Sequence, residues 1–395
     1  MVLTDAAHVY SRMLLGLKLK IFSDYYHSSI SDYFQKAGRY EHRALFVYRS
    51  LPFLVPKKHP IFRCHQSMDQ ALIIARILDE MGFVVDVADY TRGALSCRYN
   101  YDLVLSHNCF LDPDAESWRR ALKIYLASGT EHSTHNDRQW NRLSNFEARV
   151  GRQDVELIWD TEEMPWTEKA DAIFCFGNDE VAETWRRKFG CPVLPFQNTA
   201  SESVCEAHRD WHKARNEFLF LGSRQQLAKG LDLLIEAFAD CPELSLHICG
   251  HYRRDVGFCK IYRDAFQLPN IHGHGWVDMG SRKMHRLATR CGFAVSATCA
   301  EGSPGSITNM MKTGMVAILP AEAGLNFGQG VLRLGTSSIA EIRAAVRKFA
   351  GMSPETLEAI SAEALERAAQ DFSIQTFSTR WRTMLESTLA GRFPA

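Results

Sequence analysis

The chain has 395 residues, which is too long for one ordinary hydrophobic core and fits two domains of about 150–200 residues each. Lysine plus arginine balances aspartate plus glutamate, 46 against 46, so the composition predicts no general electrostatic grip on nucleic acid. The eleven cysteines are scattered from Cys64 to Cys299 without a C-x-x-C pair. This pattern argues against a disulfide framework or a structural zinc site and favours a reducing cytoplasm.

The N-terminal stretch MVLTDAAHVYSRMLLGLKLKIF lacks the uninterrupted apolar run and the small-residue cleavage site of a secretion signal. No later segment is apolar over the roughly eighteen residues that a membrane-spanning helix needs, so a soluble protein is expected. Residues 9–22 allow two interpretations. They could form a basic amphipathic helix in weak contact with a membrane surface, or a helix packed on its own domain, which we favour.

Strands and helices alternate through the first half of the chain. Apolar runs predict buried strands over 44–50, 83–90, 101–107, 122–129, 171–177 and 191–196. Amphipathic or charged stretches predict helices over 68–82, 116–122, 137–150 and 179–190. Gly82 can stop the first of these helices. This alternation implies a parallel sheet that is covered by helices on both faces.

A second alternation follows a polar connection over 198–216 that has no periodicity. Strands are expected over 217–223, 243–250, 270–275, 292–298 and 315–321. Helices are expected over 230–241, 255–267, 281–291 and 305–314. The prediction is an α/β protein with two doubly wound domains. Such domains bind ligands at the carboxyl ends of their strands, so the cleft between them is the expected site.

The turn FLGSRQQLAKGLDLLIEAF at 220–238 carries two cations at the end of a predicted strand. The strand ends at Gly222, the polar loop holds Arg224 and Lys229, and Gly230 opens an amphipathic helix. Two cations beside free backbone N–H groups suit a diphosphate. The alternative is that both are ordinary solvated surface charges.

A similar turn, EGSPGSITNMMKTG, begins at Glu301, just beyond the predicted strand 292–298. The backbone amides of Gly305 and Ser306 at the helix start would form a second anion site, and Glu301 would accept hydrogen bonds from hydroxyl groups. A carboxylate beside an anion site suits a ligand with both phosphate and polyol. Alternatively, Glu301 only caps the helix.

In order over about 217–385, the Arg-x4-Lys-Gly sequence, LDLLIEAF, LHICG, NIHGHGWVD and the acidic turn resemble the nucleotide-binding half of GT-B glycosyltransferases. The resemblance is to the large retaining group 1, family 4-like enzymes that use sugar nucleotides. It implies that Arg224 and Lys229 hold the donor diphosphate and that Glu301 contacts the donor sugar. The second glutamate of the family's E-x7-E pattern, which holds the ribose, is Asn309 here, and Ser303 and Pro304 replace an aromatic residue and a glycine.

The same resemblance implies two Rossmann-like domains that face each other across a cleft. Their expected bounds are an acceptor-side domain over 1–200, a linker over 201–216 and a nucleotide-sugar-binding domain over 217–375. The closing segment DFSIQTFSTRWRTMLES resembles the family's last helix, so residues 376–395 are expected to cross back onto the first domain.

The implied activity is that of a cytoplasmic hexosyltransferase with a UDP- or GDP-sugar donor and a glycan or lipid-linked acceptor, as in polysaccharide biosynthesis. No permanently bound cofactor and no metal are expected, because cations and helix ends can neutralise the leaving diphosphate. Asp112-Pro-Asp114 and the H-G-H of 272–274 are accordingly interpreted as turns. Two alternatives are a non-catalytic GT-B-like binding or scaffold protein, suggested by Asn309, and a sugar-nucleotide epimerase.

A histidine candidate comes from the first half. The stretch LKIYLASGTEHSTHN at 122–136 is expected to end a strand in a loop that carries Glu131, His132 and His135 toward the cleft. The resembled family often places a histidine near the donor sugar, and either His132 or His135 could match it. The alternative is a solvated or structural role for both.

Overall fold

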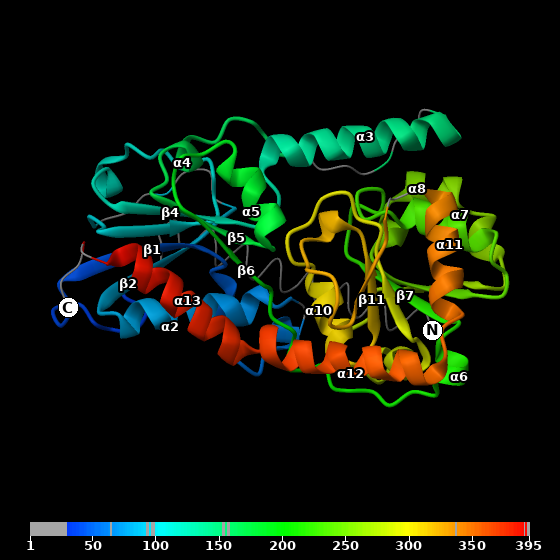
Figure 1. The fold of residues 1–395 in the computed structure, drawn as a ribbon. Helices are drawn as coiled ribbons and strands as arrows, with labels where there is room; N and C mark the ends of the chain where they lie inside the picture. The colour runs from blue at the N-terminus through cyan, green and yellow to red at the C-terminus, as the bar shows by residue number, and fades with distance from the viewer. Residues whose placement is uncertain are drawn as a thin grey trace.

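The computed structural model describes residues 30–392 except 64, 92–94, 96–98, 152–154, 156–158, 336–337 and 391. Two parallel sheets of six strands each lie side by side, with helices around them (Figure 1). We call β1–β6 with their helices the first half, and β7–β12 with theirs the second half. The predicted helix over 9–22 lies outside the described residues. Among those described, no helix is long and apolar enough to cross a membrane.

The first sheet has the strand order β2-β1-β3-β4-β5-β6. Its strands are β1 (His42–Tyr48), β2 (Phe83–Asp89), β3 (Leu103–Ser106), β4 (Leu122–Ala127), β5 (Ala172–Phe176) and β6 (Val193–Phe196). Helices α2 (Ser67–Glu80), α4 (Pro165–Glu168) and α5 (Asp179–Arg186) lie between them in the chain. Nearly every residue of β1–β5 is buried, which is why these strands read as continuous apolar runs in the sequence.

The second sheet has the strand order β12-β11-β10-β7-β8-β9. Its strands are β7 (Glu217–Gly222), β8 (Ser245–Gly250), β9 (Ile271–Gly275), β10 (Phe293–Val295), β11 (Val316–Leu319) and β12 (Val331–Arg333). Its helices are α6 (Trp211–Ala214), α7 (Leu231–Ala239), α8 (Val256–Ile261), α9 (Arg282–Arg290), α10 (Gly305–Lys312), α11 (Ile339–Ala350) and α12 (Pro354–Asp371). Strand β12 is only three residues long and was not expected from the sequence.

The last helix, α13 (Ile374–Leu389), returns to the first half, as expected. Figure 1 shows α12 and α13 running in succession along one edge of the molecule from the second half to the first. Phe377, Trp381 and Leu385 are buried in the core of the first sheet. The predicted α/β class, with two doubly wound halves and a crossing C-terminal helix, is confirmed, while the exact domain bounds stay a prediction.

Helix α3 (His132–Val150) crosses in the other direction, along the opposite edge in Figure 1. Phe146 is fully buried in the core of the second sheet. Arg142 donates through Nη2 to the carbonyl oxygen of Ala297 at 2.8 Å, and Arg149 forms an ion pair with the buried Asp232 at 2.6 Å. The two halves are therefore connected by packed helices on two sides.

One expected helix is absent, and another begins earlier than expected. The helix expected over 116–122 is a single 3-10 turn at Glu116–Trp118, because Trp118 Nε1 donates to the carbonyl oxygen of Asp112 and β4 begins soon after. The helix expected over 137–150 starts at His132, because Glu131 caps its N-terminus by accepting from the amides of Ser133 and Thr134.

Candidate functional site

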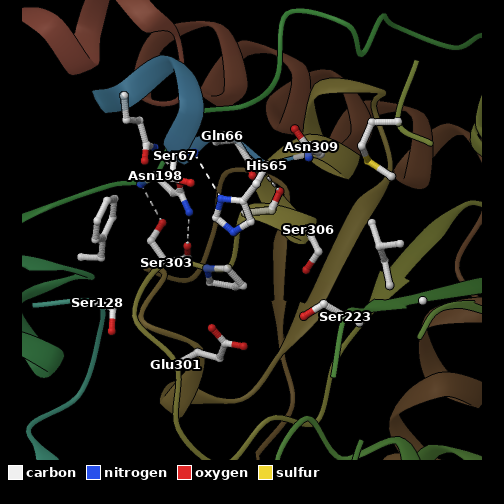
Figure 2. A pocket seen from close by; sticks show the side chains of 18 of the residues that line it. His65, Gln66, Ser67, Ser128, Asn198, Ser223, Glu301, Ser303, Ser306 and Asn309 are labelled. Carbon is white, nitrogen blue, oxygen red and sulfur yellow. Dashed lines mark hydrogen bonds between the residues drawn. The ribbon is translucent and has the colours of Figure 1, made fainter. Parts of the chain in front are cut away.

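A cavity of about 360 Å³ lies between the halves, beyond the carboxyl ends of strands from both sheets. The first half contributes polar side chains that include Arg49, Arg63, His65, Gln66 and His107. The second half contributes Gly222, Lys229, Glu301, Gly305, Ser306 and Asn309. Figure 2 shows His65, Ser223 and Ser306 around the same space as Glu301.

Lys229 and Glu301 both line this cavity and form an ion pair, and each side chain is 22% exposed. The structure therefore brings the expected diphosphate cation and the expected sugar carboxylate into direct contact. Arg224 behaves differently, because its side chain is exposed and is not among the described residues that line the cavity. The two cations of the Arg-x4-Lys-Gly turn are thus not equivalent.

The N-terminus of α10 opens into the cavity through Gly305 and Ser306. Its N-cap residue, Pro304, makes no side-chain hydrogen bond to the first turn. Gln66 of the first half donates to the carbonyl oxygen of Gly305 at 2.7 Å, and a Cβ atom at Gly305 would meet the Gln66 side chain at 2.5 Å. The helix start consequently offers backbone amides and the positive end of a helix dipole to a ligand.

The residues that depart from the family pattern are held by hydrogen bonds to residues 197–201. Asn309 lines the cavity, but its Oδ1 accepts from the Ser201 amide at 2.7 Å. Ser303 Oγ accepts from the Asn198 amide at 2.9 Å and donates to Gln197 at 2.8 Å. The altered turn is therefore anchored to the segment that joins the halves.

The Glu301 turn also touches the first half through its backbone. A Cβ atom at Gly302 would lie 2.3 Å from the carbonyl oxygen of Phe176 and 2.8 Å from Cα of Gly129, so only glycine fits there. Next to it, Thr130 Oγ1 donates to the carbonyl oxygen of Glu301 at 3.2 Å. The position of Glu301 is therefore fixed by contacts with the first half as well as by the second half to which it belongs.

Two histidines that the sequence reading missed line the cavity from the first half. His107 Nδ1 is 2.7 Å from the carbonyl oxygen of Leu126 and must donate to it, which leaves Nε2 as an acceptor in the neutral ring. Burial lowers the pKa of His107 below its ordinary value, although the bond to Leu126 opposes this. His107 directly follows β3, and its position at a strand end was the signal that could have identified it.

His65 lies just before α2 and has the opposite tautomer. Its Nδ1 accepts from the Ser67 amide at 3.1 Å, so in the neutral ring the proton is on Nε2. The ring is crowded by protein yet remains exposed toward the open cavity (Figure 2). Burial, followed by the nearby cations Arg49 and Lys229, lowers the pKa of His65. Polar residues at the start of a helix in a parallel sheet were the available signal.

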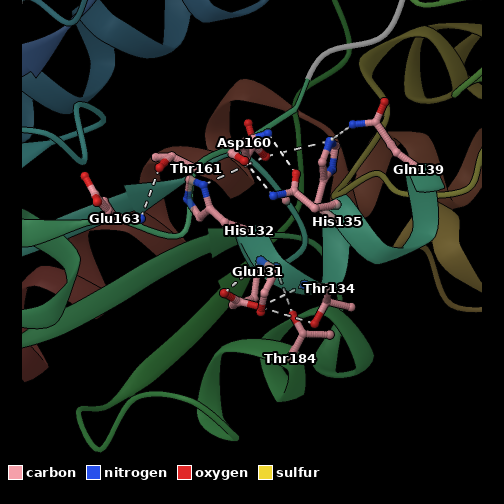
Figure 3. Close-up of polar contacts among 12 residues, drawn as sticks. Glu131, His132, Thr134, His135, Gln139, Asp160, Thr161, Glu163 and Thr184 are labelled. Carbon is pink, nitrogen blue, oxygen red and sulfur yellow. Dashed lines mark hydrogen bonds and ion pairs between the residues drawn. The ribbon is translucent and has the colours of Figure 1, made fainter.

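His132 and His135 do not line this cavity. Both lie on the first turn of α3 and face Asp160, with His132 Nδ1 and His135 Nε2 at 3.9 and 3.7 Å from its Oδ2 (Figure 3). His132 lines a second cavity of about 400 Å³, and His135 lines neither. The expected loop is therefore a helix start, and a catalytic role for these two histidines stays a prediction.

The two motifs that imitate metal sites have structural partners. Asp112 Oδ1 accepts from the Asp114 amide at 2.9 Å, which makes the expected turn. The H-G-H motif is not a turn but part of β9, where His274 Nε2 is 2.9 Å from His247 Nδ1 of the neighbouring strand. Among the residues that the structure describes, no group of three or more His, Cys, Asp or Glu side chains is arranged to hold a metal ion.

Comparisons with known proteins bear on the fold. No protein-family model matches the chain, and no curated protein sequence matches it. Sucrose-phosphate synthase from Thermosynechococcus elongatus superposes with a TM-score of 0.64 at 12% identity, over 89% of this chain and 99% of that one. Anabaena HepE in complex with UDP-glucose superposes with a TM-score of 0.58 at 13% identity, over 88% of this chain and 100% of that one.

WaaG, a glycosyltransferase of lipopolysaccharide biosynthesis, superposes with a TM-score of 0.53 at 12% identity, over 88% of this chain and 100% of that one. These likenesses extend over most of both sheets of the present chain. They confirm the GT-B fold that the sequence resemblance had implied.

Proposed function

We propose that this GT-B-fold protein is a glycosyltransferase that moves a sugar from a nucleoside diphosphate sugar to a hydroxyl group of an acceptor. One observation carries the proposal: Lys229, Glu301 and the start of α10 line a single cavity between the two sheets. A cation and uncapped helix amides suit the diphosphate, and a carboxylate suits the hydroxyl groups of the sugar.

In such a transfer the bond between the anomeric carbon and the diphosphate oxygen breaks. Positive charge grows on the sugar, and negative charge grows on the leaving oxygen. Lys229 and the amides of Gly305 and Ser306 are the groups that would stabilise the leaving diphosphate. One preorganised donor of this kind typically contributes about 2.7–4 kcal/mol to the transition state. The acceptor hydroxyl then bonds to the anomeric carbon and gives its proton to the departing diphosphate oxygen, and we propose that configuration is retained without a metal ion.

Donor binding would exchange the partners of the Lys229–Glu301 pair. Without ligand, the two side chains neutralise each other in a partly buried place. In the complex, Lys229 would turn to the diphosphate and Glu301 to the sugar hydroxyls, so each charge keeps a partner in both states. The exchange avoids leaving either ion desolvated and alone, which would cost several kcal/mol.

The first half would complete the site from across the cavity. His107 Nε2 would accept, and His65 Nε2–H would donate, toward sugar hydroxyls. Asn309 would contact the ribose through its Nδ2 hydrogens, since its Oδ1 is already bonded to the Ser201 amide. A neutral amide in place of the family's second glutamate changes how the nucleoside is held but keeps a hydrogen bond available.

The donor we propose is a UDP- or GDP-sugar, and the acceptor a glycan or a lipid-linked sugar in the cytoplasm. HepE structures with UDP, UDP-glucose, and UDP with glucose support trying uridine nucleotides first. Those ligands belong to HepE. For this chain, the base of the donor nucleotide is identified by the thermal unfolding test described next.

The test is thermal unfolding of the protein with UDP, GDP, ADP, CMP and their sugar conjugates. A ligand at a hundred times its Kd adds about 2.7 kcal/mol of stability, which raises Tm measurably. We expect one nucleotide to stabilise the parent but not Lys229→Ala, because Lys229 lines the cavity, and the same measurement on Arg224→Ala tests the predicted role of Arg224. No stabilisation by any nucleotide would contradict the proposal and favour a non-catalytic binding protein.

Product analysis with the stabilising donor then separates transfer from epimerisation. A transferase consumes the donor sugar in proportion to an added glycan, whereas an epimerase changes the donor without one.

A further inference from the structure

Two tryptophans stack on each other at the surface of the first half. Trp140, on α3, is 59% exposed, and Trp159 is 40% exposed. Their ring centroids are 4.9 Å apart, and the ring planes are inclined by 32°. Two exposed tryptophans in ring contact form one apolar patch, and tryptophan is enriched at surfaces that bind other molecules.

The pair is held in place by a reciprocal backbone contact. Asn136 Nδ2 donates to the carbonyl oxygen of Asp160 at 2.5 Å, and its Oδ1 accepts from the Asp160 amide at 2.8 Å. Trp159 is the chain neighbour of Asp160, and Trp140 follows Asn136 by one helical turn. The two rings are therefore preorganised, so a ligand would lose little free energy to ordering them.

The pair adjoins a polar path to the proposed donor site. Asp160 lines the second cavity of about 400 Å³, and that cavity shares Tyr90, His107 and Ser128 with the first. His132 also lines it, is 9% exposed, and has no hydrogen-bond partner for its Nδ1. The second cavity thus has room for a hydroxylated group, and Asp160 and Thr130 are among the polar residues that line it.

The surroundings of the pair favour a saccharide over a membrane. The exposed residues of α3 are Asp137, Trp140, Asn141, Ser144, Asn145 and Ala148, none of which is basic. Beyond Trp159 the chain continues with Asp160, Thr161, Glu162 and Glu163. A membrane-binding face needs several apolar residues and cations, which these positions lack. Sugar rings instead present weakly positive C–H groups to an aromatic face and hydroxyls to carboxylates and amides.

We propose that Trp140 and Trp159 form a platform for a sugar ring of the acceptor that is not the sugar being glycosylated. The acceptor is accordingly an oligosaccharide or polysaccharide, with its reactive unit in the second cavity and a neighbouring unit on the platform. This inference rests on the proposed glycosyltransferase function.

The kinetic test uses mono-, di- and trisaccharides of glucose, galactose, mannose and N-acetylglucosamine, with the donor found by thermal unfolding. We expect the parent to have a KM about tenfold lower for the longer acceptors. Trp140→Ala and Trp159→Ala should remove that preference while leaving donor hydrolysis and monosaccharide transfer unchanged. Ser144→Ala, one turn further on the same exposed face, is the matched control and should keep the preference. Equal preference in parent and tryptophan variants would overturn the inference.

A binding test separates failure of this inference from failure of the proposed function. Tryptophan fluorescence is followed as the same saccharides are added without donor. A change in the parent that is lost in Trp140→Ala supports the platform even if no donor is ever turned over. No response to any saccharide, or a response only to vesicles of anionic phospholipid, would overturn it.

Discussion

The two walls of the central cavity differ in how their residues are positioned. On the second-half wall, Lys229 and the start of α10 belong to strand–loop–helix units of one sheet, and their spacing along the chain is diagnostic. On the first-half wall, His65 and His107 come from separate loops that meet only because β1 and β3 are neighbours in the sheet. A local sequence motif therefore describes one wall, whereas the other needs the strand order.

The largest effect is expected on the second-half wall. Glu301→Gln removes the carboxylate that we assign to the donor sugar, and turnover should fall by about a hundred- to a thousandfold. Nucleotide binding should not weaken, because Lys229 loses its competing partner. Steady-state kinetics beside nucleotide titration checks both outcomes. A loss of nucleotide affinity with unchanged turnover would contradict the assignment.

A somewhat smaller effect is expected on the first-half wall. His107→Ala removes a hydrogen-bond acceptor from the cavity lining, and turnover should fall by up to about tenfold, because a hydrogen bond typically contributes about 0.5–1.5 kcal/mol. His272→Ala is the matched control, since His272 lies on β9 and lines neither cavity, and should change turnover little. If His272→Ala proves the more damaging variant under saturating donor, the assignment of His107 to this wall is wrong.

The start of α3, where the sequence predicted catalytic histidines, is expected to contribute to the stability of the fold. Glu131→Ala removes the N-cap of α3 and its ion pair with Lys188, which should lower the free energy of unfolding by about 1–2 kcal/mol. Burial acts to raise the pKa of Glu131, but the hydrogen bonds from Ser133, Lys188 and Thr134 together outweigh it and lower the pKa to about 2. The stabilisation is therefore complete above pH 4.5 and is lost as the pH falls from 4.5 toward 2.

The contribution of Glu131 to the free energy of unfolding is measured by denaturant unfolding of the parent and Glu131→Ala between pH 7 and pH 3. The difference between the two proteins should shrink as the pH falls. A pH-independent difference would show that the carboxylate charge is not the cause.

The smallest effect expected is a change of rate with pH. Because burial lowers the pKa of His107, its ring stays neutral at and above pH 6.5 and becomes protonated only at lower pH. Protonation removes the Nε2 acceptor, so kcat/KM should be flat from pH 6.5 to 8 and decline below. An acid limb centred at or above pH 6.5 would mean that a different group controls the rate.

Some parts of the fold and of the candidate site could be predicted from the sequence, and others could not. Continuous apolar runs predicted the buried strands, and the resemblance predicted the GT-B fold and placed Lys229 and Glu301 together. The spacing did not indicate that Lys229 lines the cavity while the Arg224 side chain is exposed, because spacing along the chain does not encode side-chain direction. The start of α3 was missed because a glutamate N-cap is less familiar than serine or aspartate, and the two histidines behind it were therefore assigned to a loop.

Helix α3 also affects how the molecule can be divided. Phe146 fills part of the second-half core. Arg142 and Arg149 of α3 form ion pairs with the fully buried Asp232. Burial raises the pKa of Asp232. Residues 217–375 expressed alone would expose the apolar surface that Phe146 covers and would leave Asp232 without its two arginine partners. We therefore expect the separated halves to be poorly folded and the intact chain to unfold as one cooperative unit.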